Sequence, residues 1–139
     1  MVSDSTIVIT DVDHVRLREM IISLRTVGNP FRGHIGELRD ALTRAKVLPA
    51  SRVPADVITM NSHAQVTNLD TGSPQILTLA YPGDCDMFGS RLSVLTSLGI
   101  RLIGQRIGDV IDWETRTGAR RLRIDAIPYQ PESAGHFYL

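Results

Sequence analysis

The segment TVGNPFRGHIGEL, residues 26–38, has amide, aromatic, basic and imidazole side chains but no acid before Glu37. Its candidate functional side chains are Asn29, Phe31, Arg32 and His34. Chemistry that needs a carboxylate, as a general base or as a cation ligand, is therefore not encoded in this turn. The segment is either a functional tip or only the bend between two helices.

Two acids follow the turn at a helical spacing. Glu37 and Asp40 are three residues apart and would share one face of a helix. Because a helix rises about 1.5 Å per residue, Glu37 should lie several ångströms behind the apex. We therefore expect neither acid to hold a cation at the tip.

The other metal-binding and nucleophilic residue types are scattered along the chain. The histidines are His14, His34, His63 and His136, with no pair four residues apart and no neighbouring cysteine pair, so we expect no metal site. Cys85 lies between Asp84 and Asp86, and we interpret GDCDM as a solvated acidic loop because no nearby cation would lower the thiol pKa. No nucleotide-binding glycine loop or nucleophile elbow occurs. The sequence predicts no cofactor and no enzymatic activity.

Arginines gather near the end of the chain, at Arg116, Arg120, Arg121 and Arg123. Guanidinium groups bind phosphates and carboxylates well, so this cluster is a candidate contact surface. A solvated strand face is an equally good interpretation. Arg121 and Arg123 alternate with Leu122 and Ile124, which predicts that both arginines lie on the exposed face of a strand.

Composition limits the classes of function. The chain has 139 residues, 42% of them hydrophobic, and a formal net charge of zero, so no overall charge attracts it to nucleic acid or to a membrane. It has one cysteine, no basic and apolar leader, and no apolar run long enough for a membrane span. We expect a soluble cytoplasmic protein.

Two amphipathic helices should position the turn. Thr10 followed by Asp13 is a capping signal, and apolar residues then recur at mostly three- to five-residue intervals, which predicts a helix over about residues 11–26. The expected apolar positions are Val12, Val15, Met20, Ile22 and Leu24. A second helix over about residues 33–46 has the apolar stripe Ile35, Leu38, Ala41, Leu42 and Ala45. Residues 1–48 thus predict an N-terminal arm and an antiparallel helical hairpin, a short coiled coil that leans on the rest of the chain or on another molecule.

The remaining sequence changes to a strand period. Residues 49–56 have the prolines and small residues of a linker. Residues 57–139 then contain a short helix ending near Gly104 and several strand patterns, namely VITM, HAQVTNLDTG, PQILTLAYPG, the opening of LSVLTSLGIRLIG, GDVIDWET and RRLRIDAIPY. These patterns predict an α+β fold in which a bent antiparallel sheet packs on one short helix.

Several motifs of this second part resemble the C-terminal domain of the bacterial Gre transcript-cleavage factors. That family runs from a strand through S-V-x-S-P-x-G into a helix and on to G-x-x-x-G-D, preceded by NLDTG-like residues. The matching positions here are Ser93, Val94, Gly99, Gly104, Gly108 and Asp109. Thr96 and Ser97 replace the usual Ser-Pro, which we expect to alter the start of the helix and not the fold. The resemblance implies an FKBP-like domain.

Three further segments are similar to the Rnk family, regulators of nucleoside diphosphate kinase and short relatives of the Gre factors. They are DVITMNS, LAYPG and YQPESAGHFYL. This resemblance covers residues 56–139 closely and the hairpin only in layout.

The resemblance implies binding to RNA polymerase, with the globular domain at the rim of the secondary channel and the hairpin pointing inward. In Gre factors, two acids at the tip help to hold the Mg²⁺ that supports cleavage of backtracked RNA; this turn lacks them, and its arms are shorter. We therefore expect a transcription regulator that competes with Gre factors without cleaving RNA. Its expected polymerase contacts are Asn29, Phe31, Arg32 and His34 at the tip, with Arg121 and Arg123 as a second patch.

Other functions are kept as alternatives. The protein could act directly on nucleoside diphosphate kinase or on another protein partner. An FKBP-like domain also suggests prolyl isomerase activity, although few aromatic residues are available for an apolar pocket besides Tyr81, Phe88, Trp113 and those near the C-terminus. Specific DNA binding is the weakest alternative, because the net charge is zero and no basic recognition helix is visible.

Overall fold

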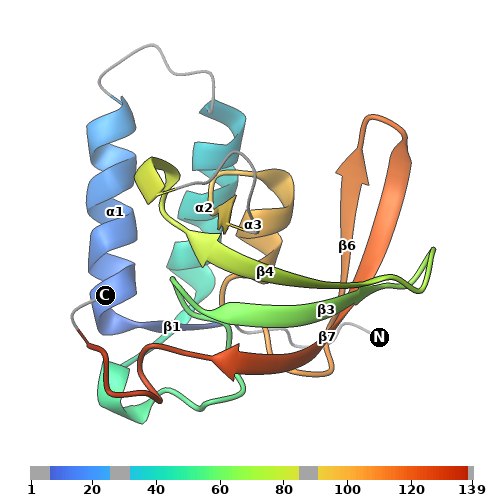
Figure 1. Cartoon of the computed structure of the whole chain (residues 1–139). Helices are drawn as coiled ribbons and strands as arrows, with labels where there is room; N and C mark the ends of the chain where they lie inside the picture. Colours follow the sequence, from blue (N-terminus) through green and yellow to red (C-terminus); the bar gives the residue numbers. More distant parts are fainter. Residues whose placement is uncertain (1–6, 26–31, 85–90, 138–139) are drawn as a thin grey trace.

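Figure 1 shows a helical hairpin beside a curled sheet in the computed structural model, which describes residues 7–25, 32–84 and 91–137. The hairpin consists of α1 (Asp11–Arg25) and α2 (Arg32–Arg44). A short helix, α3 (Ser97–Leu102), contacts both α2 and the sheet. Over the described ranges, no helix combines the length and the apolarity needed to cross a membrane.

A two-stranded parallel sheet closes the base of the hairpin. β1 (Val8–Thr10) precedes α1 and β2 (Lys46–Leu48) follows α2. The Thr10 side chain accepts a hydrogen bond from the backbone N–H of Asp13 at 3.0 Å, so the predicted cap begins α1. α2 ends two residues earlier than expected because Lys46 already belongs to β2.

The apolar face predicted for the first helix is wrong at Val15 and Ile22, whereas Met20 and Leu24 pack against the core as predicted. Val15 and Ile22 are 51% and 61% exposed, whereas Leu17 and Ile21 are buried. Apolar residues occur on more than one face of α1, so their spacing alone does not select the face that packs. The stripe predicted for α2 is confirmed, since its buried residues are Ile35, Leu38, Ala41 and Leu42.

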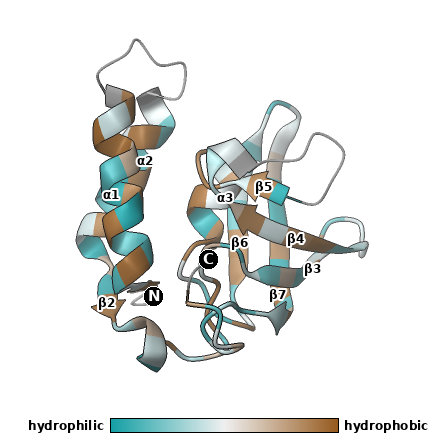
Figure 2. Cartoon of the chain, turned by 60° about the vertical axis from the view of Figure 1, so that its left-hand side comes forward, coloured by the Kyte–Doolittle hydropathy of each residue, from teal (hydrophilic) through white to brown (hydrophobic). Residues whose placement is uncertain are grey.

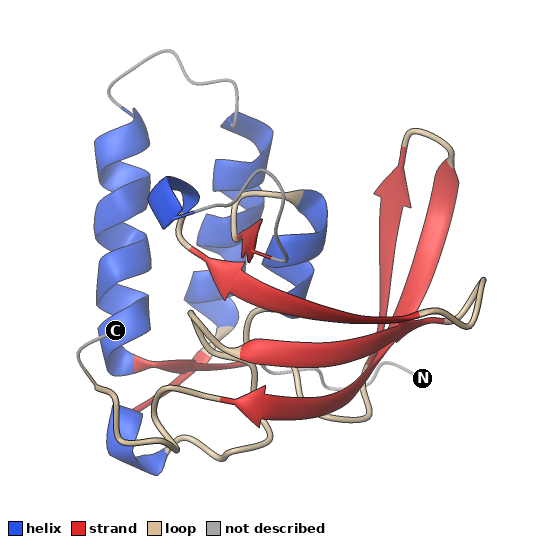
Figure 3. Ribbon diagram, viewed as in Figure 1, coloured by secondary structure: helices blue, strands red, loops and turns tan. Residues whose placement is uncertain are grey.

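The main sheet is mixed, not wholly antiparallel as the sequence predicted. Its strand order is β5-β4-β3-β7-β6 (Figure 3). The strands are β3 (His63–Asn68), β4 (Pro74–Ala80), β5 (Arg91–Ser93), β6 (Val110–Thr115) and β7 (Gly118–Tyr129). β5 lies parallel to β4, and the chain between them passes through the 3-10 turn η2 (Pro82–Asp84). A parallel pair cannot be joined by a two-residue hairpin, so this longer connection is compatible with the observed pairing. The α+β class is confirmed, and the likeness to FKBP stays a prediction.

The expected strand at residues 57–60 contributes an isolated bridge in place of a ladder. Val57 bridges Arg106, and the backbone N–H of Ile58 donates to the carbonyl of Gln105 at 2.8 Å. The chain reaches this segment through β2 and a second 3-10 turn, η1 (Ala50–Arg52). Residues 57–60 are therefore buried in the hydrophobic core and do not extend the sheet.

The start of α3 shows how the helix begins with Thr96 and Ser97 in place of the Ser-Pro of the Gre motif. Thr96 is the N-cap, and its Oγ1 accepts a hydrogen bond from the backbone N–H of Gly99 at 3.0 Å. The threonine therefore supplies the capping group itself. Gly99 packs so closely on β5 that an added Cβ would lie 2.0 Å from the carbonyl oxygen of Ser93.

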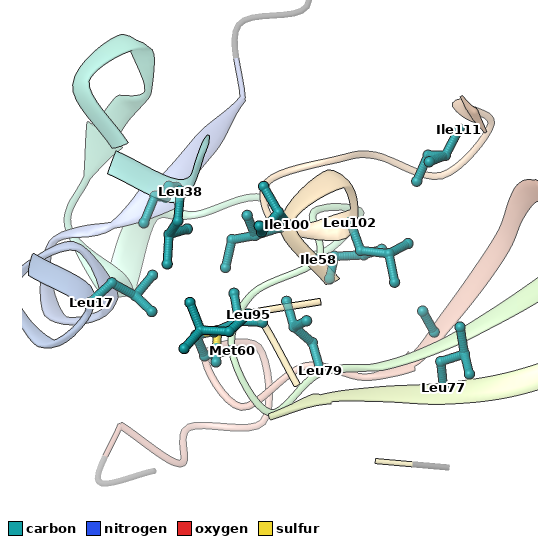
Figure 4. Close-up of a cluster of buried hydrophobic side chains, with 14 of the residues drawn as sticks. Leu17, Leu38, Ile58, Met60, Leu77, Leu79, Leu95, Ile100, Leu102 and Ile111 are labelled. Carbon is teal, nitrogen blue, oxygen red and sulfur yellow. The ribbon is translucent and has the colours of Figure 1, made fainter. Parts of the chain in front are cut away.

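One hydrophobic cluster connects the hairpin, α3 and the sheet (Figure 4). Leu17 and Leu38 of the hairpin meet a group of side chains from the rest of the chain that includes Ile58, Met60, Leu79, Leu95 and Ile100. Figure 2 shows hydrophobic segments in both hairpin helices and in β4. The hairpin thus leans on the sheet, while the boundaries predicted at residues 48 and 57 stay a prediction.

Candidate functional site

The structure places one of the four predicted tip side chains. Asn29 and Phe31 lie outside the described residues, and of Arg32 only its backbone position at the start of α2 is described. His34 is two residues further along α2, with its side chain 37% exposed. Its Nδ1 is buried, with no hydrogen-bond partner among the described residues, because the nearest carboxylate oxygen, on Glu37, is 3.8 Å away.

Glu37 is directed toward α3. Its Oε2 lies 3.3 Å from Nη1 of Arg101, and the same nitrogen donates to the backbone carbonyl of Ser97 at 3.0 Å. The negative charge of Glu37 is therefore compensated within the protein. Asp40, three residues later, is exposed on α2. Nothing local in the sequence pairs residues 37 and 101, so this contact was not predicted.

The exposed pair of Glu37 and Arg101 should contribute little to stability. Both side chains are more than a third exposed, so replacing Arg101 by alanine is expected to lower the free energy of unfolding by less than about 1 kcal/mol. Urea unfolding of the wild type, Arg101→Ala, Glu37→Gln and the double variant measures the coupling. A coupling energy well above about 1 kcal/mol would contradict this view of the pair as weak and solvated.

The described residues contain no group of three or more His, Cys, Asp or Glu side chains placed to hold a metal ion. The acidic loop GDCDM falls mostly on residues 85–90, outside the described ranges, and the Asp84 side chain is not described. His136 accepts or donates a hydrogen bond at Nδ1 with the Tyr129 hydroxyl at 2.7 Å, and His63 packs on the same tyrosine ring. These two histidines therefore help to hold the C-terminal segment against β3 and β7.

The arginine patch on the last hairpin has mixed charge. Arg121 and Arg123 are exposed on β7, as the alternation predicted. Nε of Arg123 lies 2.7 Å from Oδ1 of Asp125, and hydrogen bonds from Thr67 and then Arg123 lower the pKa of that carboxyl. Arg121 lies opposite Asp112 on β6. This face is better suited to a partner surface carrying both signs of charge than to a run of phosphates.

A buried carboxyl at the base of the hairpin was missed by the sequence analysis. Asp13 is 2% exposed. Its Oδ2 accepts a hydrogen bond from the backbone N–H of Met60 at 3.1 Å, and its Oδ1 accepts one from the Tyr81 hydroxyl at 3.4 Å. Burial raises the pKa of Asp13 to about 6. Asp13 lies four residues before Leu17, so the correct apolar face of α1 would have pointed to it.

The aromatic residues considered for prolyl isomerase activity have structural partners. Tyr81 bonds to Asp13, Trp113 is partly buried against the core, and Phe88 lies outside the described residues. The described part of the chain thus gives no support for an aromatic peptide-binding pocket around Tyr81 or Trp113.

Comparison with known proteins now defines the class. Residues 53–129 match the family model "Transcription elongation factor, GreA/GreB, C-term". A prokaryotic transcription elongation factor GreA/GreB structure from Nitrosomonas europaea superposes with a TM-score of 0.76 at 32% identity, covering 89% of this chain and all of that one. The chain belongs to the GreA/GreB family of transcription elongation factors.

A more particular likeness extends over the hairpin as well. The chain is 36% identical over 138 residues to the "Regulator of nucleoside diphosphate kinase" of Escherichia coli K12, with 99% of both chains covered. It is 28% identical to the transcription elongation factor GreA of Thermotoga petrophila, but there the match spans 64% of the longer GreA chain. The predicted relation to Rnk and to the Gre factors is confirmed. These relatives are named as regulators or transcription factors, so the protein is a Gre-related regulator.

Proposed function

We propose that this protein binds RNA polymerase at its secondary-channel region and competes there with Gre factors without stimulating RNA cleavage. The observation that carries the proposal is the position and the pairing of Glu37 in a protein of the GreA/GreB family. The turn before it has no acid, and Glu37 itself is paired with Arg101. A hairpin of this kind can occupy a channel but does not present carboxylates for a catalytic Mg²⁺. The proposal implies a cytoplasmic location, where bacterial polymerase works.

The length of the hairpin supports the same function. α1 and α2 have 15 and 13 residues, and at about 1.5 Å per residue each arm is roughly 20 Å long. The base of the hairpin is fixed by β1 and β2, and its side by the shared core. The arms therefore form a short, supported projection, which suits occupation of an entrance better than delivery of groups to a deep active centre.

The proposed contacts are the tip and the outer face of β7. The tip residues are Asn29, Phe31, Arg32 and His34. On β7, Arg121 is the better candidate, because the guanidinium of Arg123 is already engaged by Asp125. Contact of Arg123 with a partner would require a carboxylate able to share or replace Asp125.

The first experiment is a titration against core RNA polymerase with a Gre factor as competitor, followed by a cleavage assay on a stalled, backtracked complex. We expect saturable binding that the Gre factor displaces, and no RNA cleavage. The variant Arg101→Ala should also be inactive in cleavage, because a released Glu37 still lies behind the turn. Arg121→Glu should weaken binding by about fivefold or more, whereas Arg52→Glu, an exposed control, should not.

Two results would reject the proposal. One is the absence of binding at micromolar concentrations, which would mean that the Gre-like domain serves another partner. The other is stimulated RNA cleavage by the wild type, which would mean that carboxylates reach the catalytic ion despite the composition of the turn.

Direct action on nucleoside diphosphate kinase is the second candidate, favoured by the full-length likeness to proteins named as regulators of that enzyme. Purified kinase mixed with this protein tests it. A stable complex or a changed kinase rate would support a direct effect. Unchanged activity without a complex would leave the polymerase route as the explanation of that name.

A further inference from the structure

An open groove of about 210 Å³ lies between α1 and α2. It is lined by His14, Arg18, Ile21, Ile22, Arg39, Leu42 and Thr43. Neither the tip residues nor the β7 face proposed to contact polymerase is among the residues that line this groove, although the tip belongs to the same hairpin. The groove is therefore a separate surface, and its function is independent of the proposed polymerase binding.

The floor of the groove is apolar and continues onto an exposed apolar stripe. Ile21 and Leu42 are buried beneath it. Ile22 at its edge is 61% exposed, and Val15, seven residues earlier on the same helix, is 51% exposed. Because positions 15, 18 and 22 of a helix lie on one face, Val15 and Ile22 flank Arg18. Two large side chains exposed on one helix face form a surface that gains free energy when covered.

The walls of the groove carry two arginines. Arg18 comes from α1 and Arg39 from α2, and neither guanidinium has an ion pair or hydrogen bond to any residue that the structure describes. No acid is among the groove-lining residues. His14 is held across the groove, because its Nε2–H donates to the carbonyl of Leu42 at 3.1 Å. The two helices are thus linked, and the two arginines have no partner among the described residues.

We propose that this groove binds an acidic amphipathic helix of a partner protein. Apolar side chains of that helix, spaced three or four residues apart, would cover Ile21, Ile22 and Val15. Carboxylates beside them would pair with Arg18 and Arg39, whose planar guanidinium groups match carboxylates in two-point contacts. A helix packed against a helix pair is a common mode of recognition and buries such a stripe efficiently.

Other occupants fit the groove less well. Inorganic phosphate would pair with the arginines but would leave Val15 and Ile22 in water. A second copy of this chain, meeting groove to groove, would bring Arg18 and Arg39 close to their own copies, which is unfavourable for a self-complementary contact. The combination of an apolar stripe with two arginines that no described residue pairs therefore selects a ligand with apolar and acidic groups on one face.

The test uses a fluorescent, end-capped helical peptide of about 16 residues, with leucines three and four residues apart and glutamates on both sides of them. Anisotropy is measured against the full-length protein. We expect saturable binding at micromolar concentrations, weakened about tenfold or more in Arg18→Glu/Arg39→Glu and severalfold in Ile22→Ser. The exposed control Arg52→Glu, outside both the groove and the arginine cluster, should bind like the wild type. Circular dichroism confirms that each variant is folded.

The comparison peptides decide between the occupants. A peptide with every glutamate changed to lysine should not bind. Binding of the glutamate peptide should persist in millimolar inorganic phosphate. Failure of the glutamate peptide to bind at millimolar protein would overturn the proposal. So would equal binding by the double arginine variant. Full displacement by phosphate, with Ile22→Ser binding like the wild type, would also overturn it, because a simple anion site would then explain the data.

Discussion

Replacement of Gly99 by alanine is expected to lower the free energy of unfolding by about 3 kcal/mol. The added Cβ would lie 2.0 Å from the Ser93 carbonyl oxygen and 2.9 Å from its carbon. Both are backbone atoms, so the strain can be relieved only by moving α3 away from β5. That movement would also disturb the cap from Thr96 to Gly99 and the packing of Ile100. Urea unfolding monitored by far-ultraviolet circular dichroism measures the loss.

Gly36→Ala is the matched control for this substitution. Gly36 lies inside α2, and an added Cβ would have nothing within 4 Å. Alanine is the better helix former, so this change should raise the free energy of unfolding by about 0.5 kcal/mol. A Gly99→Ala protein as stable as the wild type would show that α3 can shift from β5 without loss, contrary to the packing described.

Folding stability should fall by about 3 kcal/mol between about pH 4 and pH 7 on account of Asp13. Its pKa rises from 3.8 to about 6, first because of burial and also because of the nearby charge of Glu132, while the Met60 hydrogen bond, Thr10 and Arg16 act in the opposite direction. A raised folded-state pKa means that the fold favours the neutral carboxyl. The stabilisation is therefore complete below about pH 4 and is lost as the pH rises through about 6.

The variant Asp13→Asn isolates this effect, because it keeps the size and an acceptor oxygen but cannot ionise. The free energy of unfolding of Asp13→Asn minus that of the wild type should increase by about 3 kcal/mol as the pH rises from about 4 to about 7. Urea unfolding at several pH values between 4 and 7.5 measures the difference. Asp40→Asn on the exposed face of α2 is the control for loss of a carboxylate. Parallel curves for Asp13→Asn and the wild type would contradict the burial argument.

The tip of the hairpin, which we propose contacts polymerase, illustrates how far a sequence can define a site. The lack of acids between residues 26 and 36 follows from the sequence alone, and it already argues against metal-dependent cleavage. The pairing of Glu37 with Arg101 does not follow from the sequence alone, because 64 residues separate the two in the chain. The arginine pattern predicted exposed Arg121 and Arg123 correctly. The pairing of Arg123 with Asp125 is also local, because the two residues are two positions apart on the same face of β7.

The amino-acid sequence by itself determined the features that depend on local interactions. It predicted both hairpin helices to within two residues, the cap at Thr10 and the short helix α3. The relation to the Gre factors came from the resemblance of its motifs to that family. Helical period, capping and strand alternation act over a few residues, so a sequence displays them directly.

Only the tertiary structure decided which surfaces meet. It selected Leu17 and Ile21 as the buried face of α1, left Val15 and Ile22 exposed, and paired β5 in parallel with β4. It also buried Asp13 against the backbone of Met60. The physical reason is common to all of these: each depends on contacts between segments distant in the chain, and several arrangements satisfy the same local pattern until the whole core is packed.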